Sequence, residues 1–139
     1  RMLERVSSMK VLVVDDDPIV LAVTQERLER SGYEVHVRNQ ALGTSRWITE
    51  NVPDVVLLDV MMPALSGTEL ANVLRRNDIP SIVILYSSKD PAELQKLVAE
   101  TGAAGAISKS ESDEGFMKRF ESLLRLARAA ASKPPARKE

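Results

Sequence analysis

Three short runs of consecutive apolar residues constrain the fold of this chain more than any other feature. They are Val11–Val14, Val55–Leu58 and Ile82–Leu85. A strand that is apolar on both faces fits a parallel sheet covered by helices on both sides. Weaker strand candidates lie at Tyr33–Arg38 and Ala103–Ser108. The sequence therefore predicts a sheet of five strands with helices between them.

Segments with a helical pattern separate these strands. Asp17-Pro18 and Asp90-Pro91 are typical helix starts, and Gly32 and Gly102 are typical stops. Three more helices are expected: residues 41–51, a stripe through Leu70, Val73 and Leu74, and a stripe from Phe116 to Ala127 with capping spacing at Ser110 and Asp113. Strand and helix alternate five times, which predicts an α/β, doubly wound (βα)5 fold with right-handed crossovers.

Composition limits the function further. The chain has 139 residues, enough for one domain, and it has no cysteine, a single histidine (His36) and a net charge of −1. The absence of cysteine excludes thiolate metal sites, and the near-neutral net charge gives no general electrostatic attraction to nucleic acid. No apolar run is long enough to span a membrane, and the first residues lack a secretory signal, so we expect a cytoplasmic domain. We predict a flexible leader at 1–8, the folded domain at 9–131, and a disordered tail or linker start at 132–139.

Charged and hydroxyl side chains follow the expected strands where ligands bind in such sheets, at the carboxyl ends. These residues are Asp15, Asp16, Asp59, Ser87 and Lys109. Taken singly, such residues are common in turns and on surfaces, and Asp17 is explained as a helix cap. Three carboxylates together repel one another unless a cation compensates, and hard oxygen ligands suit Mg²⁺. A carboxylate, a lysine and Mg²⁺ favour phosphoryl transfer, with an aspartate as the nucleophile.

The motifs around these residues resemble the receiver domain of two-component response regulators. The resemblance rests on Val11–Pro18, Val55–Pro63 with Ser66-Gly67, Ser87, and Gly102–Lys109. It covers residues 9 to about 128. It implies a CheY-like, flavodoxin-like fold with strand order 2-1-3-4-5.

The resemblance also implies roles for the site residues. Asp59 would accept a phosphoryl group from the phosphohistidine of a sensor histidine kinase or phosphotransfer protein. Mg²⁺, for which Mn²⁺ would substitute, would be bound by Asp16, Asp59 and the Met61 backbone carbonyl, with Asp15 acting through water. Lys109, the Ser87 hydroxyl and the Ser88 backbone amide would hold the phosphoryl oxygens.

Two departures from the family pattern concern signal transmission. Many relatives carry an aromatic residue three positions before the lysine, where this chain has Ala106, although Tyr86 lies nearby. Ser110 follows the lysine where proline is usual. Met61 and Lys89 lie two residues after Asp59 and Ser87, where side chains of relatives flank the attacking water. An apolar Met61 predicts slow autodephosphorylation.

We expect output through phosphorylation-dependent protein–protein contact at the face formed by the fourth helix, fifth strand and fifth helix. A homodimer is compatible with this expectation, whereas direct DNA binding and membrane binding are not expected. The chain should not be an enzyme beyond its own phosphorylation and dephosphorylation. Two alternatives stay open: an interaction module that works without phosphate, and a Mg²⁺-dependent phosphatase or phosphotransferase, for which the chain has little room for a substrate pocket.

Overall fold

A computed structural model describes residues 8–63 and 66–132. The leader and tail expected at the two ends lie outside these residues, apart from Ser8 and Ser132. Within the described part, no helix is long and apolar enough to cross a membrane.

The structure contains a five-stranded parallel sheet with the order β2-β1-β3-β4-β5, as predicted. The strands are β1 (Lys10–Val14), β2 (Glu34–Arg38), β3 (Val55–Leu58), β4 (Ile82–Ser87) and β5 (Gly105–Ser108). The two uninterrupted runs of β1 and β3 lie side by side in the middle, with Val14 opposite Leu58. Both runs are fully buried from Val11 and Val55 onwards, because helices cover both of their faces.

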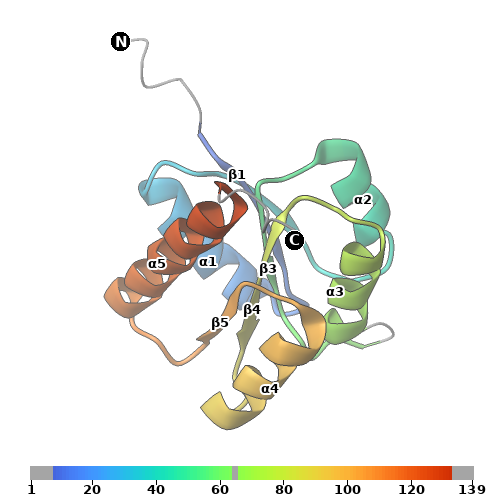
Figure 1. Cartoon of the computed structure of the whole chain (residues 1–139). Coiled ribbons are helices and arrows are strands. Elements are labelled where there is room, and N and C mark those ends of the chain that lie inside the picture. Colours follow the sequence, from blue (N-terminus) through green and yellow to red (C-terminus); the bar gives the residue numbers. More distant parts are fainter. Residues whose placement is uncertain (1–7, 64–65, 133–139) are drawn as a thin grey trace.

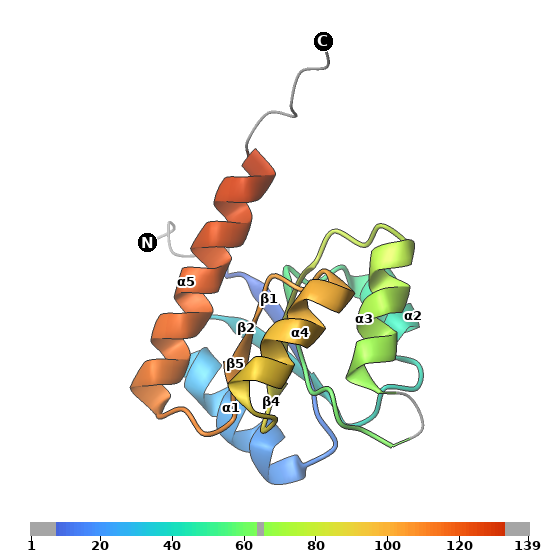
Figure 2. The same cartoon turned by 60° about the horizontal axis from the view of Figure 1, so that its bottom comes forward.

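Five helices cover the sheet in two layers (Figure 1). They are α1 (Pro18–Arg30), α2 (Thr44–Asn51), α3 (Gly67–Arg76), α4 (Pro91–Thr101) and α5 (Asp113–Ser132). In Figure 1, α1 and α5 lie on one side of the sheet, and α2 and α3 lie on the other. Helix α4 packs beside α3 and reaches towards β5 (Figure 2). The alternating strands and helices confirm the doubly wound fold.

Each layer has its own apolar core. On one face, Leu28 of α1 and Phe116 and Phe120 of α5 pack against β1, β3 and β4. On the other face, Ile48 of α2 and Leu70 of α3 pack against the same strands. Each such side chain contributes roughly 1.5–3 kcal/mol when fully buried. The alternation along the strands divides their side chains between the two cores.

Most helix ends agree with the sequence prediction. The Asp17 side chain accepts a hydrogen bond from the Ile19 backbone N–H, and Asp90 accepts one from Glu93. The start of α5 differs from our expectation: the Ser112 hydroxyl, not Ser110, accepts from the backbone N–H of Gly115. The Ser110 hydroxyl instead pairs with Ser108, because it lies in the turn that leaves β5.

Helix α2 begins later than the range 41–51 predicted from the sequence. Gly43 has a φ of 81°, a left-handed conformation that a helix cannot contain, so the first helical residue is Thr44. Ala41 still contributes to the core as a buried residue before the helix.

Candidate functional site

The predicted site residues gather at the carboxyl ends of the strands because the backbone ladder extends to them. The Asp59 N–H donates to the Val14 carbonyl at 2.9 Å. The Lys109 N–H donates to the Ser87 carbonyl at 2.8 Å. These bonds place each side chain at the end of its strand, in a fixed register with its neighbour. The site is therefore built on the rigid part of the fold.

Three carboxylates form the centre of this site. One oxygen from each of Asp15, Asp16 and Asp59 lies within 4.8 Å of the others. Asp15 and Asp59 are buried, with 1% and 3% of their surface exposed, whereas Asp16 is exposed. A single cation placed among these oxygens would contact water on the Asp16 side. The structure thus brings together the three aspartates that the sequence singled out.

The Lys109 ammonium reaches into this cluster from β5. Its Nζ lies 2.7 Å from Asp15 Oδ2 and 3.4 Å from Asp59 Oδ1. Burial by itself would lower the pKa of Lys109, but hydrogen bonds and charges from Asp15 and Asp59 outweigh burial and raise it. Lys109 is therefore a permanent positive charge between two carboxylates.

Asp59 has a carboxyl that is costly to ionise. Burial raises its pKa above the ordinary value, and the charge of Asp15 raises it further. The Met61 backbone N–H, which donates to Asp59 Oδ1 at 3.1 Å, and the Lys109 ammonium oppose this effect in part. The site would gain from a second cation, because one ammonium does not balance the three carboxylates.

The donor set fits Mg²⁺. All three side chains offer hard oxygen ligands, and the exposed Asp16 side leaves room for the waters that Mg²⁺ retains. Asp15 Oδ1 accepts a hydrogen bond from the Asp17 N–H at 2.9 Å. Asp15 Oδ2 is buried, and within the described chain it pairs with Lys109 alone. Asp15, Asp16 and Asp59 are thus the described residues whose carboxylates could hold the ion.

The residues after β4 lie at the rim of the site. Ser87 is fully buried, and its hydroxyl accepts a hydrogen bond from the Lys89 N–H at 3.0 Å. Ser88 is exposed and Lys89 is half-buried. After β3, the Met61 side chain is 56% exposed. The roles expected for these four residues stay predictions, since they concern a phosphoryl group and a metal.

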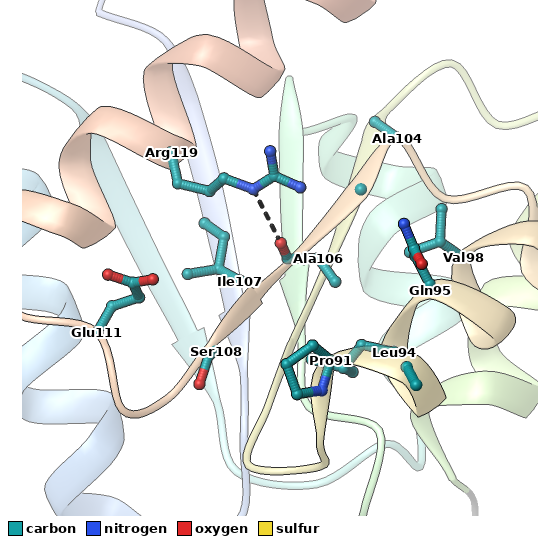
Figure 3. Close-up of a pocket in the computed structure, with 12 residues that line it drawn as sticks. Pro91, Leu94, Gln95, Val98, Ala104, Ala106, Ile107, Ser108, Glu111 and Arg119 are labelled. Atoms are coloured by element: carbon teal, nitrogen blue, oxygen red, sulfur yellow. Dashed lines mark hydrogen bonds between the residues drawn. The ribbon is translucent and has the colours of Figure 1, made fainter.

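Ala106 lies beside a groove between α4 and α5, as Figure 3 shows. The groove has a volume of about 640 Å³ and is lined by small residues of β5 and apolar side chains of α4. Arg119 of α5 crosses its edge, where Nε donates to the Ala106 carbonyl at 3.2 Å (Figure 3).

Tyr86 lies on the other face of the sheet. It belongs to the core that includes Ile107, the strand neighbour of Ala106. Tyr86 is therefore near Ala106 in the sheet but does not fill the groove. Its ring instead lies 5.8 Å from Lys109 Nζ, a contact that no local sequence signal indicated.

Fold and site together define a doubly wound α/β domain with an acidic cluster and a lysine at the strand ends. A family model described as the response regulator receiver domain matches residues 11–121. The chain belongs to this family, whose members act in two-component signalling rather than as conventional enzymes. Receiver domains bind Mg²⁺ at such acidic clusters, and response regulators work with sensor kinases.

Several curated relatives resemble the chain over most of its length. It is 32% identical to the alkaline phosphatase synthesis transcriptional regulatory protein PhoP of Bacillus subtilis, over 88% of this chain and 51% of PhoP. It is 36% identical to the transcriptional regulatory protein PrrA of Mycobacterium tuberculosis, over 86% of this chain and 52% of PrrA. The chain thus spans about half the length of these relatives.

Solved structures show the same fold. The receiver domain of the putative response regulator NarL from Mycobacterium tuberculosis superposes with a TM-score of 0.76 at 28% identity, covering 86% of this chain and 98% of that one. The chemotaxis protein CheY4 of Vibrio cholerae gives a TM-score of 0.78 at 23% identity, covering 84% and 99%. The CheY-like fold predicted from the sequence is confirmed.

Proposed function

We propose that this chain is a phosphoacceptor that takes a phosphoryl group on Asp59 from the phosphohistidine of a sensor histidine kinase or phosphotransfer protein. The observation that carries the proposal is the environment of Asp59: a buried carboxylate with Lys109 at 3.4 Å and two further carboxylates within reach of one cation. Such a carboxylate is a nucleophile held next to positive charge, which phosphoryl transfer requires.

In the proposed step, a carboxylate oxygen of Asp59 forms a bond to phosphorus. The bond between phosphorus and the donor imidazole nitrogen breaks, and the nitrogen keeps the electron pair. Mg²⁺ held by Asp16 and Asp59, with Asp15 behind them and the Met61 carbonyl as a further ligand, would neutralise phosphoryl oxygens. Lys109 would leave its place between the carboxylates and pair with a phosphoryl oxygen. The Ser87 hydroxyl and the Ser88 backbone amide would donate to the remaining oxygens.

The proposal is tested by intact-mass spectrometry after incubation with acetyl phosphate and Mg²⁺. We expect a gain of one phosphoryl group (about 80 Da by atomic mass) that is lost in Asp59→Asn and lost when EDTA removes the metal. Asp54→Asn is the matched control, since Asp54 lies at the opposite end of β3 and should not affect labelling. Without an adduct, the chain would be an interaction module that works without phosphate, an alternative that Ala106 and Ser110 favour.

We further propose the groove beside Ala106 as the surface for phosphorylation-dependent protein contact (Figure 3). Pro91, Leu94 and Val98 give it an apolar wall, and the small strand residues leave it open. A second copy of the chain is one candidate occupant. Sedimentation should then show a dimer after phosphorylation that Ala106→Glu abolishes, whereas a phosphorylated monomer would exclude a second copy as the occupant.

A further inference from the structure

Tyr86 connects the acidic site to the core beneath α5. Its ring is buried, and one of its neighbours is the Lys109 ammonium, 5.8 Å from the ring centroid. A second neighbour is the aromatic residue Phe116 of α5. Its ring centroid lies 5.4 Å from that of Tyr86, and the two rings are arranged edge to face at 71°. Both separations fall within the range at which cations and rings, or two rings, attract each other.

The contacts continue from Phe116 to α1. The guanidinium carbon of Arg27 lies 4.6 Å from the centre of the Phe116 ring. Arg27 is 8% exposed, and its Nε donates to Asp113 Oδ1 at 2.8 Å. One of its terminal nitrogens, Nη1, is buried without a hydrogen-bond partner in the described chain. A buried guanidinium with an unsatisfied donor is costly, so Arg27 depends on Asp113 and on the face of Phe116.

These contacts form one series from the site to the surface where α5 begins: Lys109, Tyr86, Phe116, Arg27 and Asp113. We propose that Tyr86 is a positioning residue for the Lys109 ammonium, and that through Phe116 it couples phosphorylation of Asp59 to the Arg27–Asp113 contact between α1 and α5. The proposal rests on the proposed function, because it assigns a response to phosphorylation of that site.

Phosphorylation would affect Tyr86 because the Lys109 ammonium contacts several groups at once. Its ammonium is held by Asp15, by Asp59 and by the face of Tyr86. Phosphoryl oxygens on Asp59 would compete for this ammonium, so the cation would move relative to the ring. Tyr86 and Phe116 lie in a close-packed core, where a shift of one ring is passed to its neighbour. Arg27 would respond because its guanidinium lies against the Phe116 ring, so that a shift of the ring changes the surroundings of the guanidinium.

This route differs from the groove beside Ala106. Tyr86 belongs to the core with α1 and α5, whereas Ala106 lines the groove next to α4. The small residue Ala106 therefore lies towards α4, and the aromatic residue Tyr86 lies towards α5. The coupling would deliver the response of the site to the start of α5 and to the neighbouring part of α1.

Two substitutions separate coupling from simple packing. Tyr86→Phe keeps the ring and removes a hydroxyl that makes no hydrogen bond within the described residues, so it is the matched control. Tyr86→Leu keeps an apolar side chain but removes the aromatic face. A third variant at the exposed end of the series, Asp113→Asn, leaves Tyr86 and Phe116 unchanged and removes the carboxylate that pairs with Arg27.

The experiment follows the Arg27 Nε–H signal by ¹⁵N NMR, together with the fluorine signals of 3-fluorotyrosine-labelled protein. The chain has two tyrosines, Tyr33 and Tyr86, and the fluorine signal that is lost in Tyr86→Phe assigns the signal of Tyr86. Spectra are recorded before and after excess acetyl phosphate with Mg²⁺, and intact mass is measured on the same samples. In the wild type and in Tyr86→Phe, the Arg27 signal should shift by more than its linewidth on phosphorylation.

In Tyr86→Leu, the phosphoryl mass should still appear, and the Arg27 shift should be lost. In Asp113→Asn, which removes the last contact of the series, the Tyr86 fluorine signal should still move on phosphorylation. An equal Arg27 shift in Tyr86→Leu, or no shift in phosphorylated wild type, would overturn the coupling and leave the phosphoacceptor function intact. Absence of the phosphoryl mass in the wild type would overturn the proposed function and the coupling with it.

Discussion

Replacing Lys109 with methionine tests the electrostatic balance of the site, because methionine keeps the length of the side chain and removes its charge. The Lys109 ammonium lies 2.7 Å from Asp15 and 3.4 Å from Asp59. At an effective dielectric constant of about 20, a unit charge attracts carboxylates at these distances by about 6 and about 5 kcal/mol. Part of this attraction is offset by the desolvation of Lys109 itself. Removing one partner of a buried ion pair costs about 3–5 kcal/mol. Since Lys109 is 20% exposed, we expect the free energy of unfolding to fall by about 2–3 kcal/mol at pH 7.

The assay is equilibrium urea unfolding without metal, compared between the wild type, Lys109→Met, and Lys109→Met combined with Asp59→Asn. The double variant should recover part of the loss, because one of the two uncompensated carboxylates is gone and Asp15 remains. The loss should also shrink in acid, where a carboxylate of the variant takes up a proton. A loss below about 1 kcal/mol, or a double variant as unstable as the single one, would refute the view that Lys109 neutralises buried charge.

Three other substitutions test separate parts of the site and fold. Asp59→Asn should stabilise the metal-free protein at pH 7. Burial raises the pKa of Asp59, so the wild type loses stability as the pH rises through that pKa. Urea unfolding should therefore show that the gain in stability vanishes below the ordinary pKa of 3.8. Met61→Asn should shorten the half-life of the phosphorylated protein several-fold by orienting water, and an unchanged half-life in timed mass spectra would exclude this role. Gly105→Ala should lower the free energy of unfolding by about 1–3 kcal/mol, because the new methyl group would lie 2.5 Å from Leu123 Cδ2. Thermal unfolding that shows no loss of stability, or the same loss in a Leu123→Ala background, would contradict the predicted clash.

The sequence was most informative where one physical requirement dominates. A strand buried on both faces must be apolar throughout, so β1, β3 and β4 were recognisable as uninterrupted runs. Asp17 and Asp90 were recognisable as caps because each precedes a proline at the start of a helix. The gathering of the site aspartates followed from topology, since parallel strands end at the same edge.

What could not be predicted depends on contacts between distant residues or on a choice among similar ones. The pairing of Arg27 with Asp113 joins residues 86 positions apart, and nothing in either segment indicates the other. Both Ser110 and Ser112 are acceptable caps for α5, and the path of the turn after β5 decides between them. The closer approach of Lys109 to Asp15 than to Asp59 depends on side-chain directions that periodicity does not determine.

The two cores of the sheet are completed at different times during protein synthesis. The core with α2 and α3 has all its strands and helices once β4 has left the ribosome, because its residues lie between Leu12 and Val83. The core with α1 is complete only after Phe116, Phe120 and Leu124 of α5 have been made, and α5 is the helix furthest along the described chain (Figure 2). A nascent chain therefore carries an uncovered apolar face beside α1 until α5 has been made. Ribosome-bound chains that end before α5 should accordingly be the ones that chaperones retain and that aggregate when released.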